Sequence, residues 1–198
     1  MPRPRRHRQG KVKFDAVTTG TGDQGESGLY SGERLPKDDE LFEVLGTLDE
    51  LASWLGLVKA SLRHGLESGF QDSFPVPDHI ERIQNDLYRI GAEAATSRGS
   101  PLFATLDPVG PADLERLEGW EKAVMKSIPL PQGFIVPGVT RLGAAVDIAR
   151  TVCRRLERRF VAWLRRAAPD GLARSVPLKY LNRLSDYLFV VARHYEKS

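Results

Sequence analysis

Apolar residues recur every three or four positions in five stretches of this chain, a spacing that is typical of amphipathic helices. In chain order, the predicted helices cover about residues 38–64, 78–94, 114–128, 141–167 and 178–195. Asp78 and Glu81 have the spacing of a capping box, so we expect the second helix to begin there. No segment of useful length alternates with period two, which predicts an all-α protein.

Segments rich in Gly, Pro and Ser separate these helices, as expected for the connections of a helical bundle. We predict a five-helix bundle, a ferritin-like up-down bundle with an ordered Gly-rich N-terminal loop. Residues 17–198 would form this single domain, and residues 1–16 would form a basic, disordered arm.

Composition agrees with a globular protein, because 41% of the 198 residues are hydrophobic and 28% are charged. The net charge of +3 comes from the arm, since residues 1–13 contain six Lys or Arg and no acid. Removing these six from the 29 basic residues leaves 23 against 26 acidic ones, a net charge of −3 for the remainder. No apolar run approaches the roughly 20 residues of a membrane span, and the single cysteine favours a reducing compartment, so we expect a cytoplasmic protein.

A loop rich in Gly, Thr and Ser precedes the first helix. Gly20, Gly22 and Gly25 match the glycines of the dinucleotide-binding fingerprint, but no strand, directly following helix or βαβ unit accompanies them. Such a loop can still present backbone N–H groups and hydroxyls to a phosphate chain. A plain surface loop is the alternative.

Arginines border both sides of the apolar stripe on the fourth predicted helix. At about 100° per residue, Arg150, Arg154 and Arg158 fall on one side with Glu157, while Arg155 and Arg159 fall on the other. Three arginines in one row with one acid leave positive charge that suits a polyphosphate or an acidic residue of a partner subunit. A solvated charged face is the alternative.

Other polar residues give weaker signals. Asp49 lies in the first predicted helix, and Asn182 belongs to a dense polar set in the fifth. The four histidines have no metal-ligand spacing, and Cys153 falls on the core stripe, where a structural thiol is expected.

With these residues in view, the sequence resembles the PduO-type ATP:cob(I)alamin adenosyltransferases over roughly residues 17–196. The resemblance rests on four blocks, which are residues 19–25 (TGTGDQG), 32–39 (GERLPKDD), 46–51 (GTLDEL), and the pair 150–159 (RTVCRRLERR) and 180–189 (YLNRLSDYLF). It implies a bundle that assembles as a homotrimer and transfers the 5′-deoxyadenosyl group of ATP to the cobalt of reduced cobalamin or a related corrinoid, releasing triphosphate.

The resemblance also implies roles for individual residues. The catalytic group would be Arg154, Glu157 and Arg158, with Mg²⁺ carried on the triphosphate and no metal ligand from the protein. Phe134 would lie under the corrin, and Asp49 and Arg150 would pair across the subunit interface. The residues implied to bind ATP are Thr19, Gly20, Thr21, Gly22, Ser27, Gly28, Lys37, Arg155 and Asn182. A flavoprotein reductase and an adenosylcobalamin-dependent enzyme are the further partners that the family suggests.

The chain departs from the family at Gly20, where a lysine is usual, and at Gln24, where a second lysine is common. Two alternatives therefore stay open. One is a non-catalytic relative that binds nucleotide or corrinoid as a carrier or sensor. The other is a helical module that binds nucleic acid through its arginines, which the acidic body disfavours.

Overall fold

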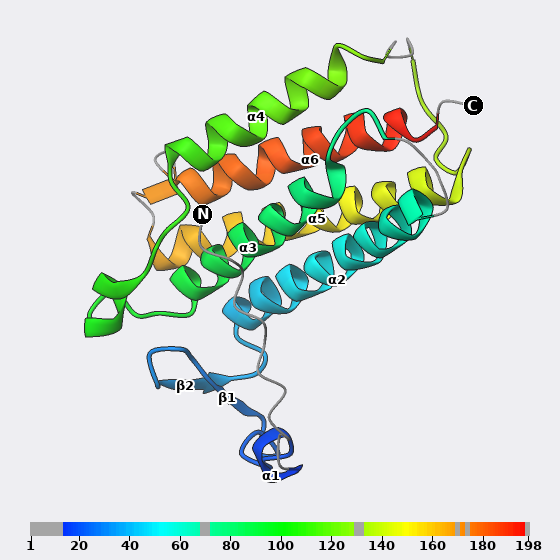
Figure 1. The fold of residues 1–198 in the computed structure, drawn as a ribbon. Helices are drawn as coiled ribbons and strands as arrows, with labels where there is room; N and C mark the ends of the chain where they lie inside the picture. The colour runs from blue at the N-terminus through cyan, green and yellow to red at the C-terminus, as the bar shows by residue number, and fades with distance from the viewer. Residues whose placement is uncertain (1–13, 68–71, 129–132, 169–170, 173–174, 197–198) are drawn as a thin grey trace.

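Five long helices carry the fold, as predicted. The computed structural model describes residues 14–67, 72–128, 133–168, 171–172 and 175–196. The helices are α2 (Glu40–Glu67), α3 (Val76–Ala94), α4 (Pro111–Met125), α5 (Arg141–Ala167) and α6 (Val176–His194). They lie side by side in one bundle (Figure 1), in which α5 packs between α2 and α6, while α3 contacts α2 and α4 contacts α6. The all-α five-helix prediction is confirmed, and α5 has the predicted bounds.

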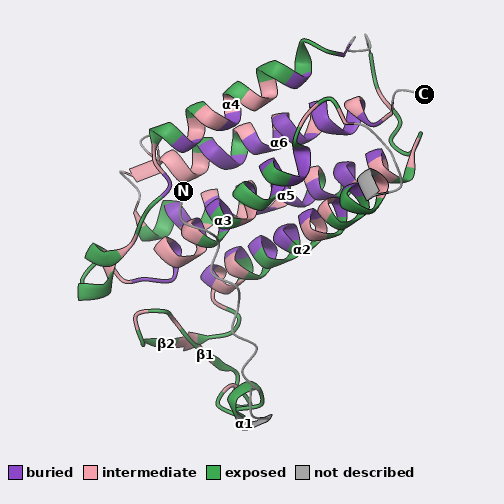
Figure 2. Ribbon diagram, in the orientation of Figure 1, coloured by how far each residue is buried: buried purple, intermediate pink, exposed green. Residues whose placement is uncertain are grey.

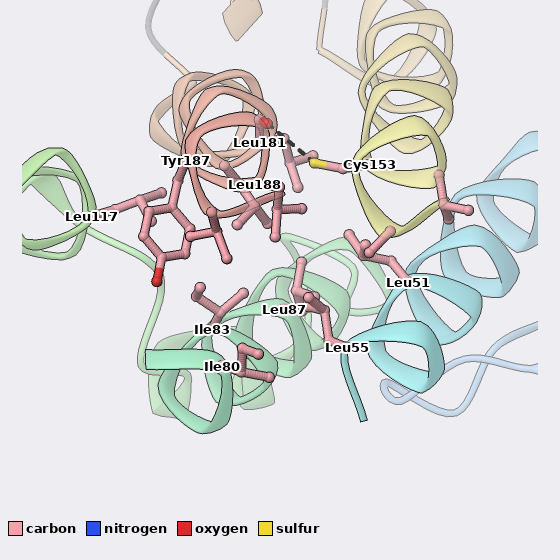
Figure 3. Packing of buried hydrophobic residues seen from close by; sticks show 14 of the residues in the cluster. Leu51, Leu55, Ile80, Ile83, Leu87, Leu117, Cys153, Leu181, Tyr187 and Leu188 are labelled. Atoms are coloured by element: carbon pink, nitrogen blue, oxygen red, sulfur yellow. Dashed lines mark hydrogen bonds between the residues drawn. The ribbon is translucent and has the colours of Figure 1, made fainter. Parts of the chain in front are cut away.

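The stripes that define these helices face one common core. Figure 2 shows the buried residues along the inner sides of the helices, and Figure 3 shows their side chains meeting between α2, α3 and α6. Leu51, Leu55, Ile83 and Leu87 are at most 1% exposed, and burying a side chain of this size stabilises a fold by about 1.5–3 kcal/mol. The core therefore holds the helices in a fixed register. No helix in the described ranges is long and apolar enough to cross a membrane.

Smaller elements precede and interrupt the bundle. They are the one-turn helix α1 (Phe14–Val17), the strands β1 (Glu26–Gly28) and β2 (Arg34–Pro36), and the 3₁₀ helix η1 (Pro101–Thr105). The strands pair antiparallel, with Ser27 opposite Leu35, and form a hairpin that extends beyond one end of the bundle (Figure 1). Three-residue strands are too short to show a period-two pattern, which is why the sequence analysis missed them. Residues 1–13 of the expected arm lie outside the described residues, and α1 continues from there to Val17.

The predicted capping box at the start of α3 is wrong. The helix begins at Val76, with Pro75 as its N-cap, and no side chain caps it. Pro77 occupies the first turn, where its missing N–H costs nothing and its fixed φ suits a helix. The proline thus extends the helix two residues upstream of Asp78.

Buried ion pairs join three of the helices. Asp86 of α3, whose side chain is 1% exposed, accepts hydrogen bonds from Arg89 at 2.8 Å, from Arg116 of α4 at 2.5 Å and from the Tyr180 hydroxyl of α6 at 2.9 Å. Burial and this nearby carboxylate raise the pKa of Tyr180 well above its ordinary value. Asp86 therefore fixes α4 and α6 against α3.

Candidate functional site

The Gly-rich loop folds as consecutive turns just before β1. Asp23 N–H donates to the Gly20 carbonyl at 3.2 Å, and Gly25 N–H donates to the Gly22 carbonyl at 3.2 Å. Gly20 has φ +65° and Gly25 has φ +85°, a backbone region that favours glycine. These turns, rather than a dinucleotide-binding βαβ unit, account for the glycine spacing.

Threonine hydroxyls and a lysine ammonium lie on this loop. The hydroxyls of Thr19 and Thr21 are 3.0 Å apart. A Cβ at Gly22 would lie 2.9 Å from Lys37 Nζ, so a side chain at residue 22 would displace the ammonium group. Lys37 N–H also donates to the Gly25 carbonyl at 2.8 Å. The loop can therefore offer hydroxyls, turn amides and one ammonium to a single anion.

Ser27 and Gly28, two of the predicted ATP-binding residues, lie in strand β1 rather than in the turns. Ser27 is partly buried and Gly28 is exposed. The hairpin thus places them beside the Gly-rich loop, as a continuation of the same segment.

Arg34 holds the loop in place, a role that the sequence analysis did not predict. Its Nη2 donates to the Thr21 carbonyl at 2.7 Å and to the Glu26 carbonyl at 3.3 Å, and its Nε lies 3.3 Å from Glu26 Oε2. Arg34 is in the quoted GERLPKDD block. Its position in a charged segment directly after the Gly-rich loop was the available signal.

A second group of predicted site residues gathers on one face of α5 and α6. Arg154 and Arg158 are exposed one turn apart, and the Arg158 guanidinium donates to the Arg154 carbonyl at 3.1 Å. Neither guanidinium forms an ion pair with a described residue. Asn182 of α6 donates to Glu157 Oε1 at 3.0 Å, which holds the carboxylate between the two helices. Two guanidinium groups one turn apart, with no acidic partner among the described residues, can both donate to one polyphosphate.

Arg155 lies apart from this group. It forms an ion pair with Glu50 of α2, and Arg159 likewise pairs with Glu43 at 2.7 Å. The helical angles predicted that these two arginines share one border of α5, and the structure shows that this border faces α2. The structure of one chain therefore does not bring Arg155 to Arg154 and Arg158.

Asp49 and Arg150 do not meet within one chain. Asp49 is exposed on α2 and makes no hydrogen bond or ion pair with the described residues. Arg150 Nε donates to Asp147 Oδ1 at 2.7 Å, and the other oxygen of Asp147 accepts from the buried Arg193. Asp147 thus orients Arg150 from within the core, while Asp49 keeps a free carboxylate at the surface.

Phe134 is fully exposed in the segment that precedes α5. Gly133 and Gly138 on either side have φ +113° and +112°, which turns the chain away from helical geometry. The apolar run that they enclose, Phe134 to Val136, presents Phe134 and Val136 to solvent. An apolar molecule or a second chain could cover these side chains.

Within one chain these groups lie at separate places. The hydrogen bonds that tie the hairpin to the bundle run from Tyr30 N–H to the Ala95 carbonyl at 3.0 Å and from Ser97 N–H to Ser31 Oγ at 3.1 Å. No hydrogen bond or ion pair among the described residues joins the Gly-rich loop to Arg154 or Arg158. A ligand that contacted both groups would have to span the distance between them or lie between two copies of the chain.

Cys153 is packed in the core, as its place on the apolar stripe predicted, and His79 is buried in the same bundle. Cys153 is buried and donates to the Leu181 carbonyl at 3.3 Å (Figure 3), and burial raises the pKa of its thiol. His79 stacks on Trp120 at 4.0 Å and hydrogen-bonds the Tyr187 hydroxyl at 2.9 Å. The described ranges contain no group of three or more His, Cys, Asp or Glu residues that could hold a metal ion.

Comparison with known proteins places the chain in a family. The sequence model of the family described as cobalamin adenosyltransferase matches residues 17–195. The chain is 36% identical over 186 residues to corrinoid adenosyltransferase MMAB of Bos taurus, which covers 92% of this chain and 72% of that protein. It is 35% identical over 186 residues to the corrinoid adenosyltransferase of Mycobacterium leprae, and this alignment covers 92% of both chains.

Solved structures give the same result. A phenylalanine-to-alanine variant of the PduO-type ATP:corrinoid adenosyltransferase from Lactobacillus reuteri, complexed with cobalamin and ATP, superposes with a TM-score of 0.75 at 29% identity. The match covers 91% of this chain and 93% of that one. An arginine-to-lysine variant complexed with ATP gives a TM-score of 0.73, also at 29% identity, over 90% and 93% of the two chains. The chain belongs to the cobalamin adenosyltransferase family.

Proposed function

We propose that this protein is an ATP:corrinoid adenosyltransferase, which transfers the 5′-deoxyadenosyl group of ATP to reduced cobalamin or a related corrinoid and releases triphosphate. Family membership supports the activity. The observation that carries it in this chain is the pair of exposed, unpaired guanidinium groups of Arg154 and Arg158 beside the Glu157–Asn182 hydrogen bond. The carrier or sensor alternative would use the same residues without the chemical step.

The chemistry explains why no protein nucleophile is needed. The cobalt of cob(I)alamin forms a bond to the ribose 5′-carbon, while the bond from that carbon to the triphosphate oxygen breaks and its electron pair leaves with the triphosphate. The protein must orient the 5′-carbon and stabilise the negative charge on the leaving group. We assign the stabilisation of the leaving triphosphate to Arg154 and Arg158. The loop hydroxyls and Lys37 would bind the remaining phosphate oxygens. Mg²⁺ would arrive with the triphosphate.

We further propose a homotrimer with its sites between subunits. The Gly-rich loop of one subunit would meet the Arg154 and Arg158 face of its neighbour, because the two groups do not meet within one chain. Asp49, exposed and unpaired in a single chain, would pair with Arg150 of the adjoining subunit. Light scattering that gives a monomer at micromolar concentration would contradict this arrangement, and Arg150→Glu should weaken the trimer through like-charge repulsion.

Phe134 is proposed to lie against the lower face of the corrin and to exclude the lower cobalt ligand. Its full exposure on a short, glycine-bounded segment supports this role, because no described residue covers the ring and it is free to pack against a ligand. Phe134→Ala should lose the four-coordinate cob(II)alamin spectrum and leave ATP affinity nearly unchanged. If the spectrum persists in that variant, another side chain performs this task.

The decisive experiment mixes protein, ATP, Mg²⁺ and chemically generated cob(I)alamin, and measures adenosylcobalamin and triphosphate. The wild type should form both in equal amounts. Arg154→Ala should lower turnover by roughly 100-fold or more, because it removes a charge-assisted contact to the leaving group. Arg63→Ala, which removes an exposed arginine of α2 that pairs with Glu81, is the matched control and should retain activity. Binding of ATP with no adenosylcobalamin formed would favour the carrier or sensor alternative.

A further inference from the structure

A cavity at the end of the bundle is separate from the proposed adenosyltransferase site. It has a volume of about 740 Å³, within the range of small-molecule sites. It opens between the C-terminal half of α5, the start of α6 and the end of α3, and Leu29 from the hairpin forms part of its wall. None of the residues that we assign to ATP or corrinoid lines it.

The walls of this cavity combine apolar and aromatic side chains with the polar residues Thr96, Ser97 and Ser175. Phe160 and Trp163 of α5 lie against each other with ring centroids 5.4 Å apart, and Phe103 of η1 belongs to the same lining. Leu41 and Ile90, which are 4% and 1% exposed, complete the apolar surface from α2 and α3. The apolar side chains favour a ligand with an apolar body, because the ligand displaces water that they cannot hydrogen-bond.

One carboxylate stands among these apolar side chains. Glu93 of α3 lines the cavity, and its Oε2 atom is buried and accepts no hydrogen bond from the described residues. Burial raises the pKa of this carboxyl, against a smaller lowering by the nearby Arg98. Arg98 also lines the cavity, but its side chain is exposed to water and forms no hydrogen bond or ion pair with Glu93. The buried oxygen therefore lacks the N–H or O–H donor that a buried acceptor normally has.

We propose that this cavity binds a small hydrophobic amine, with the ammonium group donating to Glu93 and the apolar body against Phe160 and Trp163. An ammonium group supplies both the missing donor and a compensating positive charge. It also suits the face of an indole ring, which attracts cations. The inference concerns a second site, and its test needs neither ATP nor corrinoid.

The test uses n-hexylamine, 1-hexanol and hexanoate, three probes with the same apolar chain and different head groups. Trp163 emission reports occupancy, and Trp163→Phe identifies the part of the signal that comes from this cavity. In the wild type at pH 7, hexylamine should bind at least about tenfold more tightly than hexanol, and hexanoate should bind most weakly. Equal binding of amine and alcohol, or no saturable signal with the amine, would overturn the proposal.

Glu93→Gln is the matched variant, because it keeps the shape of the side chain and removes its negative charge. It should abolish the preference for amine over alcohol and leave hexanol binding within about twofold of wild type. Glu115→Gln, at an exposed position of α4, should change neither value. A preference for the amine that survives in Glu93→Gln would show that Glu93 does not recognise it. If that variant does not fold, the ranking of the three probes on the wild type still decides the proposal.

Discussion

Replacing Arg34 with alanine tests whether the Gly-rich loop binds ATP in the conformation seen here. Arg34 donates to the carbonyls of Thr21 and Glu26, which lie at the two ends of the turns, and it pairs with the Glu26 carboxylate. Among the described residues, Arg34 makes no hydrogen bond or ion pair with a side chain that we propose to bind ATP. Arg34→Ala should therefore loosen the loop while leaving the phosphate-binding groups in place.

The size of the effect follows from the geometry. The 2.7 Å contact with the Thr21 carbonyl is a charge-assisted hydrogen bond, and such bonds contribute about 1.5–3 kcal/mol when they are shielded from water. Arg34 is 41% exposed and Glu26 is 55% exposed, so their ion pair adds only about 0–1 kcal/mol and the whole must be discounted for solvent screening. A loss of about 1–2 kcal/mol corresponds to roughly a 5- to 30-fold weaker preference for the ordered loop.

The assay is steady-state formation of adenosylcobalamin at varied ATP and varied corrinoid. We expect the KM for ATP to rise roughly 5- to 30-fold and the KM for corrinoid to stay within about twofold, because only the nucleotide meets the loop in the proposed site. Arg34→Lys keeps the positive charge but loses the planar set of N–H donors, so its KM for ATP should lie between those of the wild type and Arg34→Ala. A normal KM for ATP in Arg34→Ala would refute the reasoning, provided that Arg154→Ala is impaired in the same assay.

Three further results are expected. Gln24→Lys should tighten ATP binding at low salt, and the gain in affinity should shrink as the salt concentration rises. We choose residue 24 rather than Gly20 because a lysine at Gly20 would be strained by the φ of +65°. Gln24→Met is the uncharged control. Asp86→Ala should lower the free energy of unfolding in urea by about 1–3 kcal/mol, because the buried Tyr180 hydroxyl loses its acceptor and Arg89 and Arg116 keep only their other carboxylate partners, whereas the exposed Glu81→Ala should cost less than about 1 kcal/mol. Burial lowers the pKa of His79, and Asp78 and Asp72 oppose this with smaller effects. As pH falls below the ordinary value of 6.5, His79 is therefore protonated more fully in the unfolded chain than in the folded one. Stability should then decrease below that pH, and His79→Gln should show less of this decrease in urea titrations at pH 7.5 and 5.5.

Local patterns along the chain were sufficient to predict the helices. The long apolar stripe of α5 was sufficient to predict its bounds, and in the structure the Thr140 hydroxyl also accepts from Gly143 N–H at 3.0 Å and caps the helix. The two arginine borders of that helix follow from 100° per residue alone. Where two local signals competed, as at Pro77 and Asp78, the sequence reasoning chose the wrong one, because proline in the first turn allows the helix to begin earlier.

Long-range contacts were beyond the same reasoning. Periodicity places arginines on both sides of α5, but only packing decides that Arg155 meets Glu50 of α2 while Arg154 and Arg158 stay free. The pairing of Asp147 with Arg193, 46 positions apart, depends on how α5 and α6 cross. The hairpin held by Arg34 and the cavity around Glu93 likewise exist only once segments distant in sequence have met. The sequence by itself determined the helices and the residue types available for chemistry, because both depend on neighbouring positions. The tertiary structure alone decided which arginines of α5 are neutralised by another helix and which remain to bind a ligand, because those acidic partners lie far away in the sequence and meet the arginines only when the helices pack.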